Sequence, residues 1–151
     1  MAKRPAFTII EVLVITGLVA SLLVFTSLNL LSPQRSSALE STTTTLNSDL
    51  RHQQLQAMTG TSGGGDYGIY FNADSYVLFP GAAFTPGDPA NFSIALEPSL
   101  QFSSISWPNP LVFQAGSGQV TGAGTLTLSP TGGGTPRIFT INTYGTITQI
   151  Q

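Results

Sequence analysis

The sequence predicts an α+β protein, in which a long N-terminal helix packs on a C-terminal antiparallel β-sheet. Three observations support this fold class. Residues 12–31 form an apolar run without a charge, residues 32–59 show a helical pattern of leucines, and short alternating runs separated by Gly and Pro follow residue 60. We therefore divide the chain into a leader (1–6), an apolar helix (7–31), an amphipathic helix (32–59) and a β-rich globular head (60–151).

The composition fits a folded chain with little charge. Hydrophobic residues make up 41% of the 151 residues and charged residues 8%, whereas an average domain carries roughly 25% charged residues. The formal net charge is −2, and the few basic residues form no stripe, so a direct nucleic-acid patch is not expected. The chain has no Cys, which excludes disulfides and thiolate metal sites.

The apolar run 12–31 is long enough to cross a membrane. Its 20 residues span about 30 Å as a helix, which is the thickness of a bilayer core. Lys3 and Arg4 precede the run and favour a cytoplasmic N-terminus. We expect segment 7–31 to be a single-pass transmembrane helix in the cytoplasmic membrane, and we expect Pro33 to kink or interrupt the helix after it.

The second helix is predicted to bury one face. Leu39, Leu46, Leu50 and Ala57 follow one another at spacings of seven, four and seven, which places them on the same side of a helix. Gly60 and the glycine run 63–65 are expected to end this helix.

The rest of the chain is predicted to form strands. Runs 67–71 and 75–79 flank a three-residue loop and indicate a hairpin. Further strands are expected at 100–107, 111–114, 124–129, 137–142 and 145–150. We expect them to form an antiparallel sheet with one face packed on the leucine stripe.

One carboxylate, Glu11, stands near the start of the apolar N-terminal segment. A carboxylate at membrane depth costs several kcal/mol unless it has a partner, so such a residue is a functional candidate. The sequence around it, Arg4-Pro-Ala-Phe-Thr-Ile-Ile-Glu, resembles the class III signal of type IV prepilins and type II secretion pseudopilins. In that family a short basic leader ends in a small residue, followed by an aromatic first mature residue and by Glu at the fifth mature position.

Ala6, Phe7 and Glu11 match these three roles. The resemblance implies that a prepilin peptidase cleaves between Ala6 and Phe7 and that the new amine of Phe7 is N-methylated. It also implies that Glu11 pairs with the amine of Phe7 on a neighbouring subunit during assembly. Two positions depart from the family pattern, because Ala6 replaces the usual Gly and Leu28 stands where many major pilins have Pro.

The head extends the resemblance. The order of the helix 50–57, the hairpin 67–79, the run 111–113 and the final strands is similar to the GspH/FimT group of minor pseudopilins. The expected function is a structural filament subunit without catalytic activity, metal or cofactor. Its expected partners are other pilins or pseudopilins, the prepilin peptidase, the inner-membrane assembly platform and membrane lipid, and its final location is a periplasmic or extracellular filament.

The sequence is also compatible with other functions. The chain could be a membrane-anchored or tip-displayed adhesin or DNA-uptake module, or its N-terminus could be a secretory signal peptide or a plain signal anchor. A secreted enzyme has little support, because the only histidine, His52, is expected on a helix surface.

The remaining polar and glycine-rich features have ordinary explanations. Asp66, Asp74 and Asp88 lie in predicted loops without EF-hand spacing, so they are expected to form turns, although calcium binding by a loop is left open. The glycines at 63–65 and 116–118 lack the residues of a phosphate-binding loop. Trp107 is expected in the core.

Overall fold

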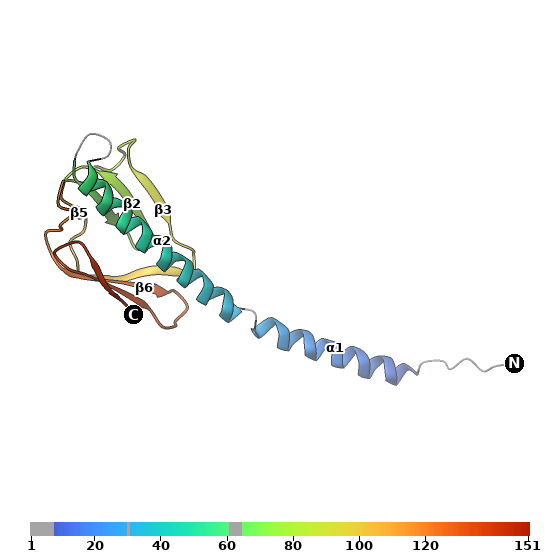
Figure 1. Ribbon diagram of the computed structural model, residues 1–151. Coiled ribbons are helices and arrows are strands. Elements are labelled where there is room, and N and C mark those ends of the chain that lie inside the picture. Colours follow the sequence, from blue (N-terminus) through green and yellow to red (C-terminus); the bar gives the residue numbers. More distant parts are fainter. Residues whose placement is uncertain (1–7, 30, 61–64) are drawn as a thin grey trace. The chain divides into compact units, whose positions relative to one another are not determined.

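The computed structural model describes residues 8–29, 31–60 and 65–151, with side chains throughout except at 24–36. The described residues form two helices followed by eight strands, and Figure 1 shows the helices and several of the strands with their labels. It divides into two compact units, Met1–Ser36 and Ser37–Gln151. We call the second of these the head unit. The leader predicted at 1–6 lies outside the described residues.

Helix α1 spans Ile9–Asn29. Its polar side chains make local hydrogen bonds, since the hydroxyl of Thr16 donates to the carbonyl of Val12 at 2.8 Å and that of Ser21 to Leu18 at 2.8 Å. Such bonds satisfy a hydroxyl group without water.

No helix in the described part of the chain is both long and apolar enough to cross a membrane. The predicted run 12–31 includes residue 30 and side chains that lie outside that part, so the membrane span stays a prediction.

Helix α2 spans Leu31–Thr59 and contains Pro33 in its first turn. The prediction that Pro33 kinks or interrupts the helix stays a prediction, because residue 30, between the two helices, lies outside the described residues. In the first turn of a helix a backbone N–H has no acceptor within the helix, so proline loses no helical hydrogen bond there by lacking this group. The fixed φ of proline also suits a helix start.

The head unit contains two four-stranded antiparallel sheets, where we had expected one. The first has the order β3-β2-β1-β5 and the second β4-β6-β7-β8. The strands of the first sheet are β1 (Tyr67–Phe71), β2 (Ser75–Pro80), β3 (Phe92–Ala95) and β5 (Leu111–Phe113). Those of the second are β4 (Leu100–Ile105), β6 (Gly124–Pro130), β7 (Arg137–Ile141) and β8 (Ile147–Ile150).

The α+β fold class and the hairpin of β1 and β2 are confirmed. Strand β3 was not predicted, because its sequence, Phe-Ser-Ile-Ala, is short and follows a Pro-rich loop. The other strands agree with the prediction to within two residues at each end.

The leucine stripe of α2 packs into the head as predicted. Leu46, Leu50 and Ala57 are at most 1% exposed, and Leu39 is also buried. They belong to one hydrophobic core with side chains from both sheets, including Phe71 and Phe139. The helix thus joins two sheets through a single core.

An aromatic cluster connects the sheets directly. The ring of Phe71 on β1 meets Phe102 on β4 edge to face, with centroids 5.4 Å apart, and lies 5.3 Å from Trp107. Trp107 is buried, so its predicted place in the core is confirmed. Edge-to-face pairs of this kind add about 0.5–1.5 kcal/mol beyond the burial of their area.

The C-terminal end of α2 is tied to two loops. Gly60 follows the helix with φ of 66° and donates its N–H to Gln56, which is a left-handed helix cap. The side-chain amide of Gln54 donates to the carbonyls of Gly118 at 3.1 Å and Tyr144 at 2.9 Å. These bonds hold the β5–β6 and β7–β8 connections against the helix.

Candidate functional site

The candidate site for assembly is the surface of α1. Ten large apolar side chains on this helix are between 49% and 87% exposed: Ile9, Ile10, Val12, Leu13, Val14, Ile15, Leu18, Val19, Leu22 and Leu23. At about 100° per residue their positions are distributed around the whole circumference of the helix, so they cover all of its sides. A helix that is hydrophobic all round is normally surrounded by other apolar groups. Within its own unit, α1 has no such surroundings in the described residues.

Glu11 lies in the first turn of this apolar helix. Its backbone N–H donates to the carbonyl of Thr8 at 3.1 Å, and its side chain is exposed. A negative charge near a helix N-terminus is favoured by the helix dipole, typically by about 0.3–1 kcal/mol. In the part of the chain that the structure describes, the carboxylate has no ion-pair partner.

The charge of Glu11 has consequences for any partner of α1. Covering the apolar surface would also remove water from the carboxylate, and an isolated buried charge is strongly unfavourable. A cation close to Glu11 would remove this penalty. A partner that covers α1 and presents a positive group at the start of the helix would satisfy this carboxylate.

The predicted cleavage and methylation residues, Ala6 and Phe7, lie outside the described residues. Cleavage after Ala6, N-methylation of Phe7 and the pairing of Phe7 with Glu11 stay predictions.

The other polar residues singled out from the sequence have local roles. His52 is exposed on α2, as predicted. Asp66 accepts the N–H of Ala115 at 2.8 Å, Asp88 accepts that of Ala90 at 2.8 Å, and Asp74 accepts the hydroxyl of Ser75. Asp74 and Asp88 act within their own turns, as expected, whereas Asp66 joins its loop to a residue 49 positions later in the chain. The described residues contain no cluster of three His, Cys, Asp or Glu side chains suited to a metal ion.

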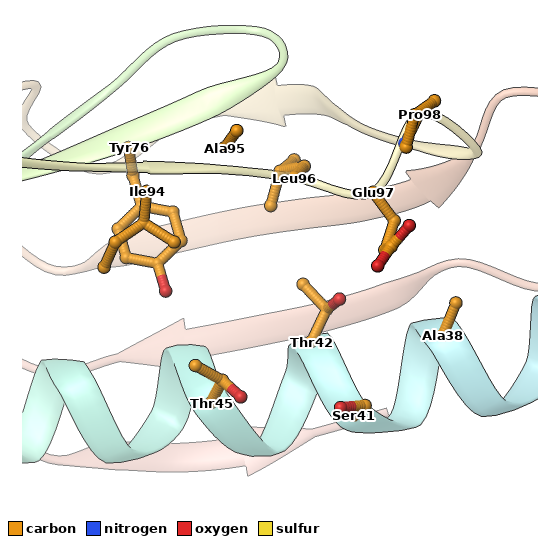
Figure 2. A pocket seen from close by; sticks show the side chains of 10 residues that line it. All are labelled: Ala38, Ser41, Thr42, Thr45, Tyr76, Ile94, Ala95, Leu96, Glu97 and Pro98. Carbon is orange, nitrogen blue, oxygen red and sulfur yellow. The ribbon is translucent and has the colours of Figure 1, made fainter.

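Several cavities border α2, and none of them could be expected from the sequence. Figure 2 shows the first, of about 300 Å³, between one side of α2 and the segment that contains β3. Tyr76 lines it, and its hydroxyl donates to Asp49 on α2 at 2.7 Å. Burial of the ring, assisted by this hydrogen bond and by the charge of Asp49, raises the pKa of Tyr76 well above its usual value.

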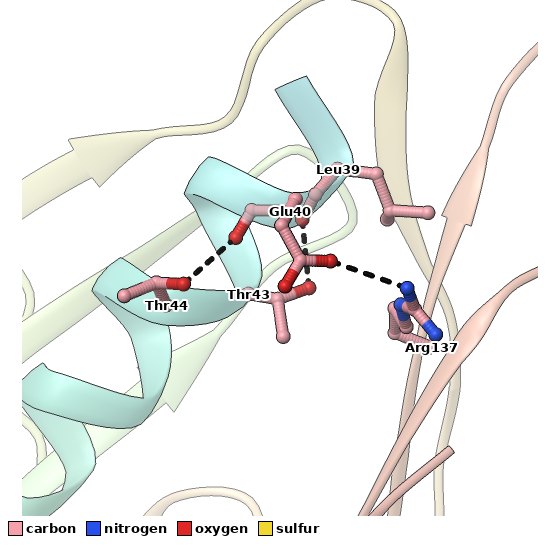
Figure 3. Close-up of polar contacts among 5 residues, drawn as sticks. All are labelled: Leu39, Glu40, Thr43, Thr44 and Arg137. Carbon is pink, nitrogen blue, oxygen red and sulfur yellow. Dashed lines mark hydrogen bonds and ion pairs between the residues drawn. The ribbon is translucent and has the colours of Figure 1, made fainter. Parts of the chain in front are cut away.

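The second cavity lies on the other side of α2. Arg137 and Ile150 line it together with helix residues that include Glu40 and Asn47. Figure 3 shows the guanidinium of Arg137 donating to Glu40 at 3.2 Å, and the hydroxyl of Thr43 donating to the carbonyl of Leu39 at 2.7 Å. The hydroxyl bond explains how Thr43 is buried beside the leucine stripe.

Neither a protein-family model nor a curated protein matches this sequence. Among solved structures, the chain is similar to the minor pseudopilin EpsH from the type 2 secretion system of Vibrio cholerae. The TM-score is 0.55 at 18% sequence identity, and the match covers 75% of this chain and 95% of that one. The chain therefore has a pseudopilin-like fold, in which an N-terminal helix is followed by a β-rich head.

Proposed function

We propose that this chain is a structural subunit of a type II secretion pseudopilus or of a type IV pilus-like filament. One observation carries the proposal: a helix that is apolar on all sides bears a single carboxylate, Glu11, in its first turn. The pseudopilin-like fold gives independent support.

The proposed route begins in the membrane. The uncharged run 12–31 anchors the precursor in the cytoplasmic membrane, with Lys3 and Arg4 on the cytoplasmic side. A prepilin peptidase removes residues 1–6, and the amine of Phe7 is methylated. An inner-membrane assembly platform then moves the subunit from lipid into a filament outside that membrane.

Glu11 acts at the assembly step. When neighbouring helices cover α1, its carboxylate pairs with the positive N-terminal amine of Phe7 on another subunit. The attraction between opposite charges grows as water is removed, and it acts only when the two helices are in the correct axial register. The pair therefore sets the position of each new subunit, while the apolar side chains supply contact area.

Processing tests the proposal directly. The full chain is expressed with and without a prepilin peptidase, and the intact mass of the purified protein is measured. The expected product has lost residues 1–6 and carries a methyl group on the amine of Phe7.

A matched variant controls for cleavage by other proteases. Ala6→Gly restores the residue usual at this position and should be cut at least as fast, whereas Ala6→Leu should be cut much more slowly. Cleavage beyond residue 31, with release of the head, would contradict the proposal.

A further inference from the structure

Two of the four sheet edges in the head are covered by other parts of the chain. At the β5 edge, Phe113 forms a bridge with Val120. At the β4 edge, the N–H of Phe102 donates to the carbonyl of Ala73 at 2.8 Å. The edges formed by β3 and β8 have no such cover among the described residues.

The hydrogen-bond pattern shows which backbone groups are open on β3. The N–H of Leu96 donates to the carbonyl of Asp74 at 2.8 Å, so these two residues face each other across the ladder. Because bonding alternates along an antiparallel pair, Ser93 and Ala95 direct their N–H and C=O groups away from β2. Both residues are exposed.

Strand β8 has the same property on the second sheet. Ile138 and Gln151 exchange hydrogen bonds of 2.9 and 3.1 Å, which places the backbone groups of Ile150 on the open side by the same alternation. The strands β3 and β8 are each four residues long. Unpaired edges of this kind are templates for pairing with another chain.

The charges beside the two strands have opposite signs. Exposed carboxylates lie on either side of β3, since Asp88 comes just before it and Glu97 just after it. Arg51 shares a cavity with Ile147 at the start of β8, and Arg137 shares another with Ile150 at its end. Glu40 balances Arg137, which still leaves one net positive charge beside β8 and two negative charges beside β3.

We propose that β3 of one copy of this chain pairs edge to edge with β8 of a second copy. The two strands have equal length, open backbone groups and flanking charges of opposite sign. Because β3 and β8 are different surfaces, a paired dimer still presents one free β3 edge and one free β8 edge, to which further copies can add. The proposal rests on the filament role proposed above for its setting, and it adds a contact between heads to the contact between helices.

Disulfide trapping tests the pairing, because the chain has no Cys and only introduced thiols can react. Full-length Ser93→Cys and Ile150→Cys chains with different tags are co-expressed with an assembly system and oxidised, because both residues direct their backbone groups to the open edges. Neighbouring strands lie about 4.7–4.9 Å apart, within the Cα separation that a disulfide spans. Ala95→Cys replaces Ser93→Cys in a parallel sample, to include a pairing shifted by two residues.

The expected result is a dimer that contains both tags, at least tenfold more abundant than in either single-variant sample. Ser103→Cys on the covered β4 edge, mixed with Ile150→Cys, serves as the matched control and should give no dimer. Adding Glu97→Arg to the β3 chain should weaken the cross-link, and adding Arg51→Glu to the β8 chain as well should restore it.

Three results would overturn the proposal: no mixed dimer with either β3 variant, an equal dimer from Ser93→Cys alone, or a cross-link to a different protein. The filament role is tested separately, by asking whether the wild-type chain forms filaments. If it does not, that role fails, and the same cross-linking on detergent-solubilised full chains still decides the pairing.

Discussion

The leucines of α1 and those of α2 have opposite environments. Leu22 on α1 is 63% exposed, whereas Leu50 on α2 is 1% exposed. The core of the head is built from residues 38–147, and no described side chain of α1 contributes to it. The head is therefore stabilised by contacts among its own residues, whereas the apolar surface of α1 is available to other molecules.

The largest expected effect comes from truncating one leucine to alanine in each of the two helices. Leu50→Ala should lower the free energy of unfolding of the head by about 2–5 kcal/mol, because it leaves a cavity in a closed core. Leu22→Ala should change it by less than about 0.5 kcal/mol. Chemical denaturation of the detergent-solubilised full chain, followed by the fluorescence of Trp107, measures both. Equal losses would show that α1 belongs to the core of the head.

Glycines test how tightly the loops are held to α2. Gly145 has φ of 74°, and a Cβ there would collide with the carbonyl of Gly118 and lie 2.7 Å from the Gln54 amide. Gly145→Ala should cost about 2–4 kcal/mol from backbone strain and overpacking. Gly133→Ala is the control, since φ there is 82° with nothing within 4 Å, and it should cost about 1–2 kcal/mol. Equal losses of stability for the two variants would mean that the β7–β8 connection is not held tightly against α2.

A smaller effect depends on pH. Tyr76→Phe removes the hydrogen bond to Asp49 and should cost about 0.5–1.5 kcal/mol at neutral pH. Since the pKa of Tyr76 is raised in the folded protein, only the unfolded chain loses this proton near its usual pKa. The stability that Tyr76 contributes is therefore complete below about pH 10 and is lost above it.

Denaturation at pH 7, 9 and 10.5 measures this loss. The difference between wild type and Tyr76→Phe should shrink at the highest pH. Tyr144→Phe, at a side chain that is 68% exposed, should show no such change. A constant difference for Tyr76→Phe would contradict the raised pKa.

The periodicity of the sequence was enough to predict most of the fold. The spacing of Leu39, Leu46, Leu50 and Ala57 identified the buried face of α2, because a helix repeats every 3.6 residues. Alternation located most strands but could not assign them to two sheets, since partner choice depends on long-range contacts such as that between Phe71 and Phe102. Strand β3 was missed for a local reason, because its four residues are too short a run to show a clear alternation.

The features of the candidate site and of its surroundings also fall into those that the sequence reveals and those that only the structure reveals. Glu11 was evident as a lone charge in an apolar segment, because composition alone reveals it. The pair between Arg137 and Glu40 and the bond between Tyr76 and Asp49 join residues far apart in sequence. No local pattern marks such contacts, so only the folded structure identifies them.

Assembly by Glu11→Val chains tests the central claim most directly. The full-length variant is expressed with an assembly system, and the amount of sheared filament is compared with wild type, with Glu11→Gln, which removes only the charge, and with Thr16→Val as a polar-to-apolar control on the same helix. We predict at least a tenfold loss of filament for both Glu11 variants, wild-type amounts for Thr16→Val and unchanged unfolding of the head in all three. Filaments at the wild-type level from Glu11→Val would contradict the account.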